Sequence, residues 1–271
     1  MVMNVSKSIR QNQLDQIREL LMHTVIIKLE KYSRETTYMP FLSRIIQSDE
    51  LVAAYSFIHS ISTTLGMSVY EQISRILLVT RGVPENHVHL KYKLGGQISD
   101  GQRSEIAGIV SDLSDGSSFA NRLEQSNRVL NARSSGELHT PKPATVDLFY
   151  KLGDEEFYID IKTVKPNMGN FKELKRQLLE WVARRDAVVN TLIALPYNPY
   201  HPQPYERFTV KGLLIPGEEM QVGEEFWNDL AGWPIYEDLL HIFNEVGKSL
   251  QNEVKIKIAG VASEFRRLLK P

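Results

Sequence analysis

The sequence predicts a mixed α/β fold in which a central sheet is flanked by helices, with further helices at both ends of the chain. Three stretches carry this prediction. Residues 146–152 and 157–161 are short apolar and aromatic runs separated by a turn, so we expect a β-hairpin. Residues 170–187 repeat apolar side chains at steps of three and four, which is typical of an amphipathic helix. Residues 188–195 are nearly all apolar, as expected of a strand buried on both faces.

Helical patterns flank this core. Apolar side chains recur at helical spacing in residues 5–60, and aromatic residues do so in residues 222–270. The capping preferences place the start of the central helix at Asn170. We expect one domain over residues 1–271, with three parts: a helical N-terminal region (1–60), a catalytic core (61–215) with an insertion at 84–139, and a helical C-terminal region (216–271).

The composition excludes several classes of protein. Hydrophobic residues make up 42% of the chain and charged residues 24%, which is ordinary for a globular protein. The absence of cysteine excludes disulfides, zinc–thiolate sites, iron–sulfur clusters and cysteine nucleophiles. The sequence has no signal-peptide pattern and no apolar run of about 18 residues, so we expect a cytoplasmic protein with no membrane partner.

The hairpin carries the residues that point to chemistry. Asp160 and Lys162 are two positions apart, so a strand presents both side chains on one face. Asp147 lies on the preceding strand, and the turn folds it back beside them. Two carboxylates and one ammonium on a sheet face suit a hard divalent cation and an attacking water, which is the apparatus of phosphodiester hydrolysis. The alternative is that these are solvated charges on an ordinary hairpin.

An upstream helix offers a further acid. Residues 64–78 are apolar on nearly all sides, and Glu71 lies among them, so its carboxylate is expected to be buried and to need a partner or a metal. The competing interpretation is a surface pair between Glu71 and Arg75 at i,i+4. Glu105 is the alternative upstream acid.

The order strand, strand, helix, strand around an Asp…Asp-x-Lys hairpin resembles the PD-(D/E)XK nuclease superfamily, although Val146 replaces the proline of that name. Phrases at 65–73, 140–147 and 160–167 together look like the TdeIII-type family of type II restriction endonucleases. The resemblance implies a restriction-endonuclease-like core and a Mg²⁺-dependent enzyme that cuts both strands of double-stranded DNA at a short site. It also associates the chain with GGNCC-type sites and with a cognate DNA methyltransferase.

Roles follow from this chemistry. Asp147 and Asp160 would hold Mg²⁺, with the backbone carbonyl of Ile161 as a further ligand, because Mg²⁺ needs few protein ligands and keeps several waters. Lys162 would position or deprotonate the attacking water. Glu71 would complete the catalytic set.

DNA contact is expected despite a net charge of −1, because phosphate contacts are local. The expected contacts are basic or polar residues near the hairpin: Lys142, Lys165, Asn167, Lys172, Lys175 and Arg176. Arginines of the insertion (Arg122, Arg128 and Arg133) suit base edges, although a plain surface helix is an equal alternative. Symmetric cutting implies a homodimer. Two other functions stay open, a repair or recombination nuclease of the same superfamily and a non-catalytic DNA-binding or interaction protein.

Overall fold

The computed structural model describes residues 7–32, 40–162, 168–206 and 212–268. The chain divides into two compact units. One runs over Ser74–Tyr236, and the other combines residues on both sides of it, Val5–Ile73 and Glu237–Pro271. The mixed α/β class is confirmed, since a five-stranded mixed sheet is flanked by helices. The single domain over 1–271 stays a prediction.

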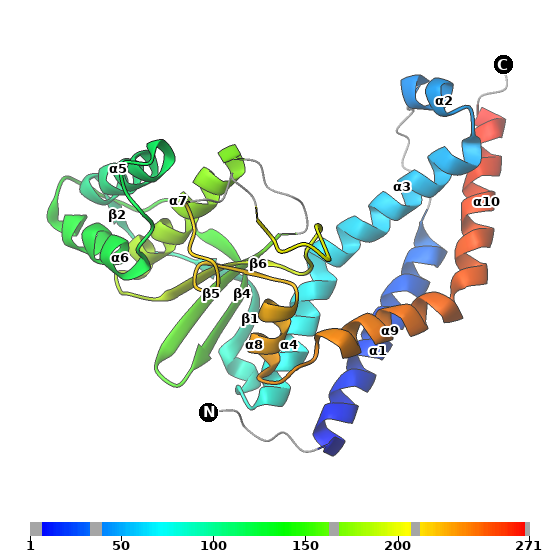
Figure 1. Ribbon diagram of the computed structural model, residues 1–271, viewed down its shortest axis with the longest axis horizontal. Coiled ribbons are helices and arrows are strands. Elements are labelled where there is room, and N and C mark those ends of the chain that lie inside the picture. Colours follow the sequence, from blue (N-terminus) through cyan, green and yellow to red (C-terminus); the bar gives the residue numbers. More distant parts are fainter. Residues whose placement is uncertain (1–6, 33–39, 163–167, 207–211, 269–271) are drawn as a thin grey trace. The chain divides into compact units, whose positions relative to one another are not determined.

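The central sheet has the strand order β1-β4-β5-β6-β7 (Figure 1). β1 pairs antiparallel with β4 and β4 antiparallel with β5, whereas β5 with β6 and β6 with β7 are parallel. The bounds are β1 Val88–Leu94, β4 Ala144–Leu152, β5 Glu155–Ile161, β6 Asn190–Leu195 and β7 Met220–Val222. A separate pair joins β2 (Ile98–Ser99) to β3 (Leu138–His139).

The predicted hairpin is β4 and β5, and its apolar backing face is present, since Ile159 and Ile161 are buried. The predicted buried strand is β6. Two assignments were wrong. Residues 88–94 were placed in an insertion but form β1, an edge strand of the central sheet, and residues 220–222 were placed in a helical region but form β7. Each short strand gains its stability from pairing with a distant partner, which local pattern does not reveal.

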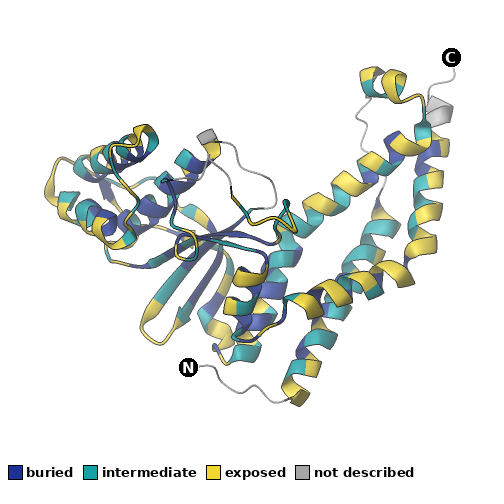
Figure 2. Cartoon of the chain, viewed as in Figure 1, coloured by how far each residue is buried: buried dark blue, intermediate teal, exposed yellow. Residues whose placement is uncertain are grey.

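Helices α5 (Asp100–Asp115), α6 (Arg122–Asn131) and α7 (Met168–Arg185) pack together with the sheet. Their core includes Trp181, Tyr158, Phe149 and Ile193, all buried. Figure 2 shows the buried residues on the strands and inner helix faces, with an exposed hairpin tip. α7 begins at Met168, so Asn170 is its third residue and the predicted cap was wrong. Also in this unit are most of α4 (Tyr70–Arg81), η2 (Glu85–His87), η3 (Ala132–Ser134) and α8 (Glu224–Ala231).

The second unit is helical. Its core joins Tyr32 of the segment after α1 to Phe57 of α3 and Val261 of α10. The elements are α1 Lys7–Lys31, α2 Pro40–Ile46, α3 Asp49–Thr64, the π-helix η1 Leu65–Val69, the start of α4, α9 Tyr236–Ser249 and α10 Gln251–Leu268. In the described part of the chain, no helix has the length and apolarity to cross a membrane.

Candidate active site

The hairpin brings the two aspartates of the predicted site together. Leu148 of β4 pairs with Ile159 of β5, and continuing this antiparallel register sets Asp147 opposite Asp160. Their carboxyl groups share a hydrogen bond. Oδ2 of Asp147 also accepts a hydrogen bond from the backbone N–H of Ile161 at 3.0 Å. The β4–β5 ladder is therefore completed at this end by a side chain.

Lys162 lies immediately beyond β5. Its backbone N–H donates to the carbonyl of Ala194 at 2.9 Å, which fixes the chain against β6. Its ammonium lies 2.7 Å from Oδ2 of Asp160 and the side chain is 37% exposed, whereas that of Asp160 is 5% exposed. The three predicted groups thus form one cluster in which the acid is buried and the ammonium faces solvent. The interpretation of solvated charges on an ordinary hairpin does not hold for Asp160.

A second ammonium, which the sequence did not reveal, joins this cluster. Nζ of Lys91 on β1 lies 2.8 Å from Oδ1 of Asp147. The φ of Lys91 is +50°, which lies in the left-handed region.

 The other described non-glycine residues in this region, Gln47 (+53°) and Asp186 (+56°), both directly follow helices. Lys91 alone among the described strand residues other than glycine has this conformation, so its ion pair with Asp147 coincides with local backbone strain.

The two carboxyl groups differ in their protonation equilibria. Burial, followed by the hydrogen bond with Asp147, raises the pKa of Asp160 to about 6. Burial also pushes the pKa of Asp147 upward, but its hydrogen bonds outweigh this and hold the pKa below its usual value. The donors are Asp160, Lys91 and the Ile161 N–H. Asp160 is therefore the member of the pair that more readily carries a proton and donates it to the Asp147 carboxylate.

The donor set fits a hard divalent cation. Oδ2 of Asp160 is buried and, within the described residues, receives no well-directed hydrogen bond, although the Lys162 ammonium is close to it. When both groups are ionised, the two adjacent carboxylates repel each other, and a cation between them would relieve the repulsion. In the described part of the chain, no group of three or more His, Cys, Asp or Glu side chains could hold a metal. Mg²⁺ keeps several waters and needs few protein ligands, so the carboxylate pair suits it.

The two candidate upstream acids lie in different surroundings. Glu71 is 2% exposed at the start of α4, so its predicted burial is confirmed. Arg75 pairs with Glu85 at 2.6 Å. The competing interpretation was a surface pair between Arg75 and Glu71. Met67 belongs to the segment 64–78 that was expected to be apolar on nearly all sides, but it is 65% exposed and lies in the π-helix Leu65–Val69. Glu105 on α5 pairs with Arg128 at 2.6 Å.

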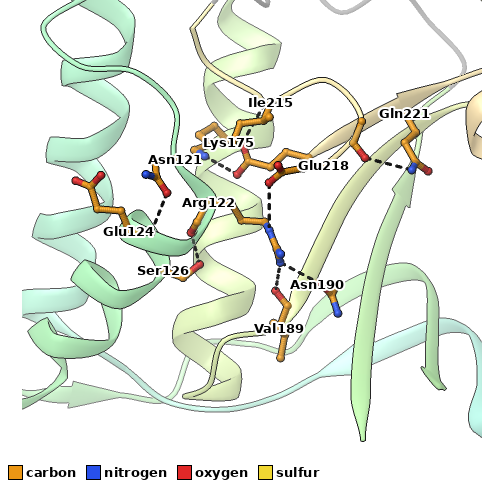
Figure 3. Close-up of polar contacts among 12 residues, drawn as sticks. Asn121, Arg122, Glu124, Ser126, Lys175, Val189, Asn190, Ile215, Glu218 and Gln221 are labelled. Atoms are coloured by element: carbon orange, nitrogen blue, oxygen red, sulfur yellow. Dashed lines mark hydrogen bonds and ion pairs between the residues drawn. The ribbon is translucent and has the colours of Figure 1, made fainter. Parts of the chain in front are cut away.

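One predicted DNA contact is corrected by the structure. Lys175 is fully buried, and its ammonium lies 2.5 Å from Oε1 of Glu219, so it does not face solvent. Oε2 of Glu219 accepts the N–H of Ile215, and Figure 3 shows Lys175 beside that segment. Lys142 is exposed before β4, and Lys172 and Arg176 are half-buried on α7. The other two, Lys165 and Asn167, lie outside the described residues.

The arginines proposed to read bases are held within the protein. Arg122 donates to Oδ1 of Asn190 at 3.1 Å and to the carbonyl of Val189, as Figure 3 shows. Arg128 pairs with Glu105, and Arg133 pairs with Asp186 at 3.0 Å. These contacts tie the helices of the insertion to each other and to the end of α7.

Comparisons with known proteins agree on one family. Residues 5–247 match the family model described as type II restriction endonuclease, HinfI. The chain is 29% identical over 208 residues to the type II restriction enzyme MjaII of Methanocaldococcus jannaschii, covering 70% of this chain and 54% of that relative. It is 26% identical over 242 residues to HgiEI of Herpetosiphon aurantiacus, a type II restriction enzyme, covering 85% of each. The chain thus spans about half the length of MjaII but most of HgiEI. No solved structure matches.

Proposed function

Because the chain belongs to the HinfI family of type II restriction endonucleases, we propose that it hydrolyses phosphodiester bonds in both strands of double-stranded DNA at a short specific site. The family implies a divalent metal cation, and we propose Mg²⁺. The observation that carries the proposal is the shared site of Asp147, Asp160 and Lys162 at one end of the β4–β5 hairpin.

The carboxylates of Asp147 and Asp160, with the carbonyl of Ile161, would hold the ion. When bound, it supplies Lewis-acid stabilisation of the negative charge on the phosphate and on the leaving oxygen. Oδ2 of Asp160 is available for this role, since it receives no well-directed hydrogen bond from the described residues. Asp147 is held in place by the Ile161 N–H, so the pair is positioned before a ligand arrives.

Lys162 lies on the solvent-facing side of the Asp147–Asp160 pair. Its half-exposed ammonium can orient the water that attacks phosphorus and offset charge on the phosphate. Asp160 holds this ammonium at 2.7 Å, which limits the positions it can take. Glu71 remains the proposed upstream acid on the basis of its burial. We also propose a homodimer with one site for each strand and a protecting methyltransferase as the partner activity.

Incubation of supercoiled plasmid with the protein tests this proposal directly. With Mg²⁺ we expect discrete linear fragments, and with EDTA we expect uncut plasmid. Indiscriminate or structure-selective cutting would favour a repair or recombination nuclease. No cutting of any DNA substrate with Mg²⁺ or Mn²⁺ would overturn the proposed activity and favour a non-catalytic DNA-binding protein.

A further inference from the structure

Helices α5 and α7 pack against each other in the same unit (Figure 1). The side chains between them leave a groove. It consists of two cavities of about 380 and 310 Å³ that share Arg176. Their α7 wall is one stripe at steps of four residues, Lys172, Arg176, Glu180 and Arg184, and α5 contributes Arg103 and Asp115. We call these six residues and the space between them the α5–α7 groove.

The groove is rich in positive charge, and only part of it is paired: Arg176 lies 3.3 Å from Glu173 on the same helix. Four of its six charged residues are basic, and only Asp115 and Glu180 are acidic. Arg103 and Arg184 form no ion pair with any residue in the described ranges, whereas Arg122, Arg128 and Arg133 nearby each have an acidic partner. The pairing of the other arginines makes the two unpaired ones stand out as available for a ligand.

Arg184 in particular lacks partners. Its Nε and Nη1 are buried and, among the described residues, neither donates a hydrogen bond. Burial lowers the pKa of this guanidinium, with Glu180 opposing the shift and Arg103 adding to it. Buried donors without acceptors are costly, and an anion in the adjoining cavity would satisfy them.

A close backbone contact with Gly96 fixes the C-terminal end of α7. Gly96 has a φ of +111° and approaches α7 so closely that an added Cβ would lie 2.1 Å from the carbonyl oxygen of Arg184. The loop after β1 therefore seats the last turn of α7. This contact holds Arg184 in the groove rather than leaving it at a frayed helix end.

We propose that the α5–α7 groove binds phosphate groups of the DNA backbone away from the scissile position. The inference rests on the proposed function, since it supplies the duplex. Guanidinium groups bind phosphate oxygens through paired N–H donors. From Lys172 to Arg184 the stripe extends about 18 Å along the helix, which is longer than one small anion needs. α7 begins six residues after Lys162 in the sequence, so Lys172 is the residue of the stripe that follows the catalytic cluster most closely along the chain.

The salt dependence of DNA binding tests the groove with a matched pair of variants. Arg184→Gln removes the unpaired cation, and Arg185→Gln removes its neighbour on the same helix, whose guanidinium is already engaged with Glu156 at 2.6 Å. Both are made in an Asp160→Ala background, and a fluorescent duplex is titrated at several salt concentrations. We expect Arg184→Gln to reduce the slope of log affinity against log salt by about one, for any DNA sequence, and Arg185→Gln to leave it unchanged.

Equal slopes for the two variants would overturn the inference. Arg184→Lys keeps the charge and should restore the slope, which separates charge loss from misfolding. If inorganic phosphate raises the melting temperature of the wild type but not of Arg184→Gln while the DNA slopes agree, the groove binds a small anion and the DNA assignment fails. If the wild type cuts plasmid but the two variants have equal salt slopes, only this inference is overturned. If Arg184→Gln changes the salt slope but the wild type does not cut, only the proposed activity is overturned.

Cross-linking gives an independent readout that does not depend on the arginines. The chain contains no cysteine, so Ala107→Cys in the groove carries a unique site for a photoreactive label. Asp154→Cys, at the exposed turn of the hairpin, is the control. We expect the label at 107 to cross-link to duplex DNA and the label at 154 to do so at least several-fold less. The reverse order would exclude the groove as a DNA contact.

Discussion

Two clusters of buried charge in the same unit are arranged in opposite ways. At the hairpin, Asp160 is buried beside a second carboxyl, and the ammonium 2.7 Å from its Oδ2, that of Lys162, is 37% exposed and makes no well-directed hydrogen bond to it. Between α7 and the segment before β7, Lys175 and Glu219 are equally buried, but the ammonium and carboxylate neutralise each other at 2.5 Å. The first cluster is left incomplete by the protein and the second is complete, which distinguishes a site for a ligand from a structural pair.

The largest expected effect is on catalysis at the incomplete cluster. Asp160→Ala removes one proposed ligand of the ion, and cleavage should fall at least about a thousandfold while duplex binding persists. Glu156→Gln is the matched control, because Glu156 is on the same face of β5 but pairs with Arg185 and Lys151. It should retain cleavage within about tenfold. Plasmid cleavage rates measure both, and comparable losses in the two variants would contradict the assignment of Asp160.

The complete cluster should respond through stability instead. Lys175→Met leaves the buried Glu219 carboxylate without its cation, and unfolding should become easier by about 3–5 kcal/mol. The double variant Lys175→Met/Glu219→Gln removes both charges and should regain most of that loss, while the glutamine oxygen can still accept the Ile215 N–H. Urea unfolding monitored by circular dichroism gives these values. A single variant as stable as the wild type would show that the pair does not hold α7 in place.

Much of this contrast between the two clusters could be predicted from the sequence, and the wrong prediction for Lys175 shows what was overlooked. Lys175 follows Phe171 by four residues and precedes Leu178 by three, so it is on the apolar stripe of α7 and its burial was readable. Lys175 was predicted to contact DNA because it belongs to a group of basic residues near the hairpin, and the face of the helix on which it lies was not considered. The hairpin was predictable because its two strands are adjacent in the sequence. Lys91 was not, since its strand meets β4 only across about fifty intervening residues.

A smaller effect concerns Asp160 in the metal-free protein. Its pKa is raised to about 6, so the folded state holds a proton that the unfolded chain releases near pH 4. The stabilisation that the Asp160 proton contributes is therefore fully present below about pH 4, falls as the pH rises through about 6, and is lost above it. Asp160→Asn keeps a hydrogen-bond donor toward Asp147 and removes the charge. At pH 7.5 in EDTA it should be more stable by about 2 kcal/mol.

Thermal melts of both proteins from pH 4 to 8 in EDTA measure this difference. The gain from Asp160→Asn should shrink toward pH 4, where the wild type is protonated. Added Mg²⁺ should stabilise the wild type more than the variant, because the variant lacks one carboxylate. A variant less stable than the wild type at pH 7.5 would mean that the carboxylate is well satisfied without a metal.

The smallest effect tests the strain at Lys91. Lys91→Gly and Lys91→Ala both lose the ion pair with Asp147, but only glycine adopts a φ of +50° without steric cost. The glycine variant should therefore be more stable than the alanine variant by about 1 kcal/mol in urea unfolding. His89, two residues earlier on β1 and without a positive φ, is the control, and there glycine should be the less stable of the two. The same order at both positions would show that Lys91 relaxes when its side chain is removed, and that its side-chain contacts are what hold its backbone in the left-handed region.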